Sequence, residues 1–100
     1  MQQEKEQFLN LKNAPARLTT EEAAWFLGFA PHEIPVMMAE GLLKPLGHPP
    51  RNGPKFFATA ELEDRRRDFK WLAKASDAIV AHWQIKNSRK ASTQAANGKS

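Results

Sequence analysis

The chain lacks several features that whole classes of protein require. None of its 100 residues is cysteine, which excludes a disulfide bond and a thiolate metal site. No apolar run is long enough to span a bilayer, and the N-terminal stretch MQQEKEQFLNLKN lacks the apolar centre of a signal peptide. These absences lead us to expect a cytoplasmic protein, bacterial or phage in origin, that has no membrane partner.

Motifs for catalysis and for metal binding are missing as well. The sequence contains no glycine-rich phosphate loop, and no serine or threonine lies in a nucleophile motif. The three histidines, His32, His48 and His82, are scattered without the spacing of metal ligands. We therefore expect a protein that is not an enzyme, with no catalytic residue, no metal site, no cofactor and no small-molecule substrate.

Length and charge set further bounds. One hundred residues, of which 41% are hydrophobic, suffice for one small globular domain with a limited core. Residues 1–50 carry four Lys/Arg against six Asp/Glu, and residues 51–100 carry eleven against five, so the two halves have net charges of −2 and +6. A basic half indicates a polyanionic partner, most often nucleic acid. The alternative is that this charge only keeps the protein soluble.

The stretch LTTEEAAWFLGFAPHEIPVMMAEGLLKPL, residues 18–46, organises the chain. Thr19 can cap a first helix, and Glu22 follows it at the spacing of a capping box. Gly28 is a natural end for this helix. A second helix opens on Pro31, where the missing N–H of proline costs nothing. Two short helices joined by a short turn that contains glycine describe a helix-turn-helix.

The next stretch, KPLGHPPRNGPKFF at residues 44–57, predicts a projecting hairpin. Leu43–Leu46 and Lys55–Phe57 form its two short strands, and two glycines and three prolines restrict the loop between them. Five polar residues without a single acid lie along it: Lys44, His48, Arg51, Asn52 and Lys55. A rigid loop of this kind can reach a minor groove or a row of phosphates. The alternative is an ordinary exposed hairpin.

These stretches resemble the winged helix-turn-helix of MerR-like regulators and phage-type excisionases. The matching features are Leu18-Thr19 before an Ala-Ala helix, Leu27-Gly28 before a short turn, and Gly41-Leu42 before a strand. The resemblance continues through a wing at Gly47 to Phe57 and a final helix opened by Thr59, over about 55 residues. It implies a mainly α fold with a small β-hairpin wing, which binds double-stranded DNA.

The second helix departs from this pattern. In the family it usually enters the major groove and is rich in Arg, Ser, Thr and Tyr, whereas here it reads PHEIPVMMAE. It contains no Arg or Lys and has two glutamates, Glu33 and Glu40, which oppose phosphates. We therefore predict that the wing leads binding. His32, near the start of this helix, is a candidate DNA contact, and the alternative is a surface or packing residue.

Residues 60–97 contain neither proline nor glycine and are strongly helical. They form one long helix, or two with Ser76-Asp77 capping the second. Apolar residues recur seven apart with others between them, at Leu62, Phe69, Leu72, Ile79 and Trp83. Polar residues interrupt this stripe, so it is a poor coiled coil and predicts a monomer or a weak homodimer.

The run Arg65-Arg66-Arg67 is the most basic part of this helical segment. Glu61, Glu63 and Asp64 stand three or four residues before its outer arginines, so most of the charge is paired along its own helix. Arg66 is the least paired, which makes it a candidate phosphate contact.

The sequence thus predicts an N-terminal helical arm at 1–16, a winged helix-turn-helix domain with a C-terminal helix or helix pair at 17–87, and a disordered basic tail at 88–100. We expect a small DNA-binding protein, either a transcriptional regulator or an excisionase-like accessory factor. The alternative is a protein-interaction adaptor on the same scaffold, whose contact surface would be Val36, Met37 and Met38.

Overall fold

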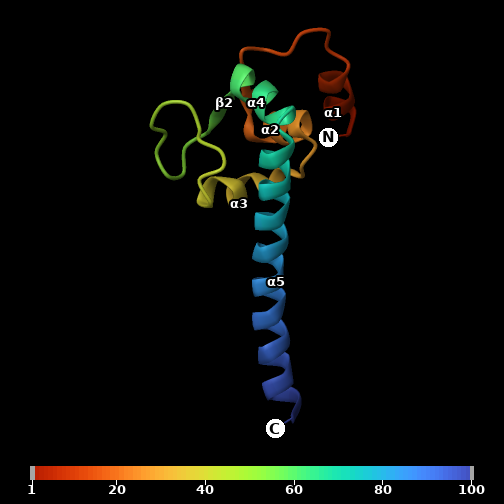
Figure 1. Cartoon of the computed structure of the whole chain (residues 1–100), viewed down its shortest axis with the longest axis vertical. Coiled ribbons are helices and arrows are strands. Elements are labelled where there is room, and N and C mark those ends of the chain that lie inside the picture. Colours follow the sequence, from red (N-terminus) through yellow and green to blue (C-terminus); the bar gives the residue numbers. More distant parts are fainter. Residues whose placement is uncertain (1, 100) are drawn as a thin grey trace.

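The computed structural model describes the backbone of residues 2–99 and the side chains of residues 4–88. Within this range the chain is mainly helical, with one small antiparallel sheet (Figure 1). The elements in chain order are α1 (Gln2–Leu9), β1 (Arg17–Thr19), α2 (Thr20–Leu27), the 3-10 turn η1 (Pro31–Glu33), α3 (Ile34–Ala39), β2 (Phe56–Ala58), α4 (Thr59–Arg66) and α5 (Phe69–Lys99).

Helix α2 has the ends that the sequence predicts. The Thr19 hydroxyl accepts the backbone N–H of Glu22 at 3.2 Å, and the Glu22 carboxylate accepts the N–H of Thr19 at 3.0 Å. Gly28 follows the helix at φ 89°, a left-handed conformation that favours glycine, and its N–H donates to the Ala24 carbonyl at 2.8 Å. The predicted capping box and glycine stop are both confirmed.

The second helix is shorter and less regular than the sequence suggests. It opens at Pro31 with the 3-10 turn η1 and becomes α-helical only from Ile34. Pro35 therefore lies in the first turn of α3, where its missing N–H breaks no helical hydrogen bond. The Glu33 carboxylate accepts the N–H of Ala30 at 2.8 Å, which fixes the start of this segment.

The sheet differs from the predicted hairpin. Strand β2 pairs with β1, with Leu18 opposite Phe57, and residues 43–46 do not form a strand. One backbone hydrogen bond, from Leu46 N to Phe56 O at 2.8 Å, is what joins these residues to β2. The predicted strand pairing is therefore wrong. Pro45 offers no N–H to a ladder, whereas the segment before α2 offers a full set of backbone groups.

The long helical region is two helices. The break lies at residues 67–68, and the Asp68 carboxylate accepts the N–H of Trp71 at 3.0 Å to cap α5. Ser76, the cap suggested by the sequence, lies inside α5 and donates its hydroxyl to the Leu72 carbonyl at 2.8 Å. Thr59 is the first residue of α4, after Ala58 at the cap position, and its hydroxyl donates to the Pro15 carbonyl. Thr59 therefore opens this helix, as the sequence predicts, whereas the cap suggested at Ser76 is wrong.

The core lies between α2, α3, the sheet, α4 and the first half of α5. Helix α5 contributes Trp71, Ala75 and Ile79, which are spaced by four residues and are all buried. Phe69, which the sequence assigned to the apolar stripe, is 81% exposed. The stripe predicted with a spacing of seven is therefore wrong at this position, because α5 is capped at Asp68 and turns its buried face away from Phe69.

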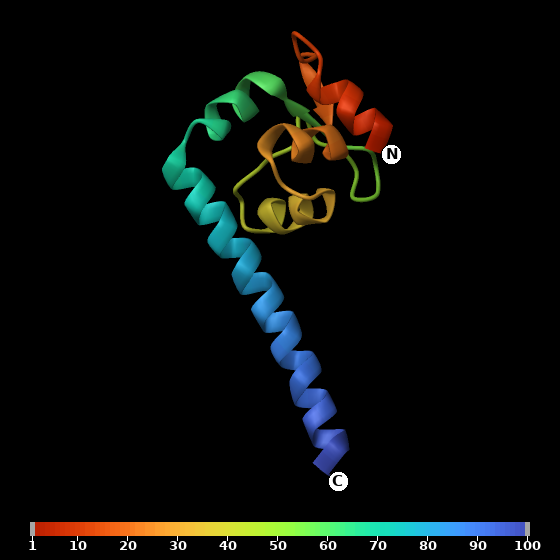
Figure 2. The same ribbon diagram turned by 90° about the vertical axis from the view of Figure 1, so that its right-hand side faces the viewer.

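The second half of α5 continues away from the body of the protein in both views (Figures 1 and 2). The whole molecule accordingly measures 58 by 30 by 29 Å. The backbone stays helical to Lys99, where the sequence predicted a disordered tail from residue 88. Residues 88–97 contain no proline or glycine and three alanines, which favours a helical backbone. No described helix has both the length and the apolarity needed to cross a bilayer.

Candidate nucleic-acid interface

The loop of residues 44–55, here called the basic loop, projects from the globular part. It leaves the domain shortly after α3, projects to one side in Figure 1 and returns at the start of β2. The hydrogen bond between Leu46 and Phe56 closes its base. Lys44, His48, Arg51 and Asn52 are all exposed along it. The structure therefore brings these four predicted contact residues together in one loop.

A tight turn shapes the tip of the basic loop. The N–H of Gly53 donates to the Pro50 carbonyl at 2.9 Å, so Arg51 and Asn52 are the two central residues of a β-turn. A Cβ atom added at Gly53 would lie 2.6 Å from Cγ of Pro50, so the turn tolerates only glycine there without rearranging. Arg51 and Asn52 therefore form the turn at the tip of the basic loop.

The side chain of Lys55 forms hydrogen bonds within the basic loop. Its ammonium group donates to the Arg51 carbonyl at 3.0 Å and to the Gly53 carbonyl at 3.3 Å. These bonds tie the returning segment to the turn, so Lys55 braces the loop in addition to adding positive charge. The sequence assigned Lys55 a direct DNA contact and did not anticipate this bracing role.

One basic residue near this loop, Arg17, was not predicted from the sequence. Arg17 lies on the exposed face of the sheet, with its guanidinium carbon 4.3 Å from the ring centroid of Phe56. As the alternation along the strand predicts, Phe57 is 1% exposed and Phe56 is half-buried. The pairing of β1 with β2 places Arg17 there, whereas the sequence predicted that residues 43–46 pair with β2.

The second helix presents few groups that read bases. His32 is exposed on η1, and its ring centroid lies 5.7 Å from that of Trp83 on α5. The amino group of Lys86 lies 5.0 Å from the same Trp83 ring. A groove of about 380 Å³ runs between α3 and α5 beside these side chains. The outward face of the second helix is therefore bordered by α5, and His32 does not lie in the basic loop.

Arg66 also lies apart from the basic loop. Arg66 is the last residue of α4, and its guanidinium carbon is 4.8 Å from the ring centroid of Phe26 in α2. Figure 2 shows this end of α4 at the upper left and the basic loop at the right. Of the ion pairs predicted along α4, Glu63–Arg67 forms at 3.1 Å, while the Arg65 guanidinium lies 6.0 Å from the Trp71 ring.

The described residues hold no metal-binding cluster, and the comparisons with known proteins found no match. Within residues 4–88, no group of three or more His, Cys, Asp or Glu side chains is placed to hold a metal ion. No protein-family model, no curated protein and no solved structure matches the chain. The resemblance to MerR-like regulators and excisionases therefore stays a prediction.

Proposed function

We propose that this chain is a small double-stranded-DNA-binding protein, a transcriptional regulator or excisionase-like accessory factor, built as a winged helix-turn-helix. In this proposal α2 and the η1–α3 segment form the helix-turn-helix, and the basic loop acts as the wing. The observation that carries the proposal is the basic loop itself. It projects from the domain, is closed by its own turn and by Lys55, and contains no acidic residue among its twelve residues.

The charges of the basic loop suit a phosphate backbone. Lys44 and Arg51 are exposed, and Arg17 stands nearby on the sheet against the ring of Phe56. Neutralising phosphates with such side chains releases counterions, so binding should weaken steeply as salt rises. An arginine at the tip of a braced turn also suits a narrow minor groove, where the negative potential is concentrated.

The second helix has a supporting role in this proposal. It carries no lysine or arginine, so it lacks the donors that recognise guanine in the major groove. The Glu33 carboxylate is occupied by the N–H of Ala30, which leaves Glu40 as the exposed acid of this segment. We therefore assign the helix to docking against the duplex and the loop to binding it.

The adaptor alternative loses support from the packing of α3. It requires Val36, Met37 and Met38 to form an exposed apolar surface. Met37 is 0% exposed and Val36 is 8% exposed, while Met38 is half-buried against the core. A surface that the protein itself covers is not available to a partner.

Fluorescence anisotropy with a labelled random duplex of about two helical turns tests the proposal. We expect binding at about 50 mM salt that falls steeply as salt is raised. Arg51→Ala should weaken binding by about 1–3 kcal/mol if the side chain reaches base edges, and by less if it touches only phosphate. His32→Ala should have a smaller effect than Arg51→Ala. Arg67→Ala, which removes an equal charge at the end of α4, is the matched control.

Circular dichroism must show that each variant is folded. Absence of binding at about 50 mM salt contradicts the proposed function. A loss for His32→Ala without a loss for Arg51→Ala contradicts the assignment of the loop and makes the second helix the reader.

A further inference from the structure

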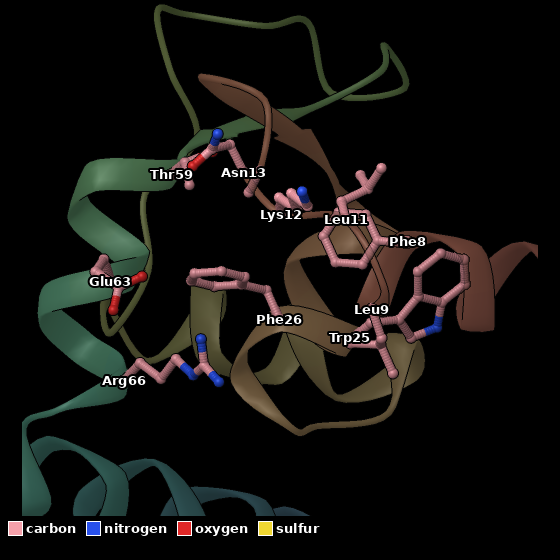
Figure 3. Close-up of a pocket in the computed structure, with 11 residues that line it drawn as sticks. Phe8, Leu9, Leu11, Lys12, Asn13, Trp25, Phe26, Thr59, Glu63 and Arg66 are labelled. Atoms are coloured by element: carbon pink, nitrogen blue, oxygen red, sulfur yellow. The ribbon is translucent and has the colours of Figure 1, made fainter.

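A cavity of about 380 Å³ lies between α1, the segment that links α1 to β1, α2 and α4 (Figure 3). Its volume falls in the range of about 300–1,000 Å³ that is typical of sites for small molecules. The linking segment is tethered, because the Thr59 hydroxyl and N–H donate to the carbonyls of Pro15 and Ala16. This tether holds the segment against the start of α4.

Aromatic rings form the apolar part of this cavity. Phe8 of α1 lies against Trp25 of α2, with ring centroids 5.8 Å apart and a tilt of 55°. Phe26, from the next position of α2, stands between them and α4 in Figure 3. Phe8 is buried, whereas Trp25 and Phe26 are half-buried. The cavity therefore retains aromatic surface that a flat apolar molecule can cover.

The charges along the cavity favour an anion. Arg66 holds its guanidinium carbon 4.8 Å from the centroid of Phe26 and points toward the cavity in Figure 3, and Lys12 lines the cavity from the linking segment. Glu63 is the acid among the lining residues, and it forms an ion pair at 3.1 Å with Arg67, which is not part of the lining. The lining therefore carries two positive side chains, Lys12 and Arg66, against one acid, so its net charge is positive.

We propose that this cavity binds a small anion with a flat apolar body, of the class of aromatic carboxylates. The planar guanidinium of Arg66 can receive the carboxylate through two parallel hydrogen bonds, and Lys12 adds a second positive charge. The apolar body lies on the rings of Phe26 and Phe8. This site goes beyond the proposed DNA binding, because α1 lies on the side opposite the basic loop in Figure 1 and the end of α4 lies on the side opposite it in Figure 2.

Titration of the full chain with naphthoate tests the proposal, followed by NMR through the three tryptophan indole N–H signals. We expect saturable binding that shifts the Trp25 signal most, since Trp25 lines the cavity and Trp71 and Trp83 do not. The neutral naphthylmethanol should bind the wild-type chain at least about tenfold more weakly, which corresponds to about 1.4 kcal/mol.

Two variants isolate the charge. Arg66→Gln should lower naphthoate affinity by about tenfold or more, whereas Lys70→Gln, which removes an exposed positive charge outside the lining, should retain wild-type affinity within about twofold. Equal affinity for naphthoate and naphthylmethanol overturns the proposal, and so does unchanged affinity in Arg66→Gln. Absence of a Trp25 shift at millimolar naphthoate overturns it too. The comparison of the two compounds uses the wild-type chain, so it decides the matter even if Arg66→Gln fails to fold.

Discussion

Replacing Trp71 with phenylalanine tests how α5 holds the segment from which the basic loop begins. Trp71 is 7% exposed, and its indole N–H donates to the Leu42 carbonyl at 3.0 Å, between α3 and the loop. Its ring also meets the ring of Phe29 edge to face, with centroids 6.3 Å apart. Phenylalanine keeps an aromatic ring in the core but cannot donate to Leu42.

The cost of this substitution follows from these contacts. Leaving the partly buried Leu42 carbonyl without its donor costs about 1–3 kcal/mol. The smaller ring leaves a gap beside Phe29 and adds roughly 1 kcal/mol. We therefore expect Trp71→Phe to lower the free energy of unfolding by about 2–4 kcal/mol. In a chain of this size, that is a drop in Tm of about 8–32 °C.

Thermal and urea unfolding followed by circular dichroism measure this change. Trp83→Phe is the matched control, because Trp83 is half-buried on the same helix and meets His32 and His82 only through ring contacts. We expect the control to lose less than about 1 kcal/mol. Equal losses for the two variants would refute the reasoning, since the hydrogen bond to Leu42 would then contribute nothing beyond the removal of indole surface.

Three further predictions concern the helix ends and the basic loop. Thr19→Ala should lower the free energy of unfolding by about 1 kcal/mol in urea titrations, because it removes the cap of α2, while Thr20→Ala should change it less. Gly28→Ala should cost about 1–2 kcal/mol in the same assay, since φ is 89° there, and a neutral result would show that the turn relaxes. Lys55→Met should weaken duplex binding in anisotropy more than Lys44→Met, because it removes the brace of the turn as well as a charge. Equal losses for the two lysine variants would mean that Lys55 acts by charge alone.

Two features of the structure depend only on residues that are close together in the sequence. The groups that cap α2 are three residues apart, so the hydrogen bonds between Thr19 and Glu22 do not depend on the packing of the rest of the chain. The turn at the tip of the basic loop is equally local, since it joins Pro50 to Gly53. Both features could be predicted because every group involved lies within one short stretch of sequence.

The prediction of a wing strand at residues 43–46 is wrong because strand pairing depends on residues far apart in the sequence. Residues 43–46 and Arg17–Thr19 are both short segments able to pair with β2, and the alternation along β2 does not distinguish between them. The pairing of Leu18 with Phe57 buries both side chains, and this decides the competition. Arg17 could not be predicted as a neighbour of the basic loop without that pairing.

By itself, the sequence determined the absence of thiol chemistry, the ends of α2, the turn at Arg51 and the charge of the basic loop. Each of these depends on residue type or on hydrogen bonds within a few residues. Tertiary structure alone decided that Trp71 is buried while Phe69 is exposed, and that Arg66 lies over Phe26 beside a cavity. Which face of a helix is buried depends on the elements that pack against it. Those contacts join residues far apart in the chain, and no local pattern in the sequence specifies them.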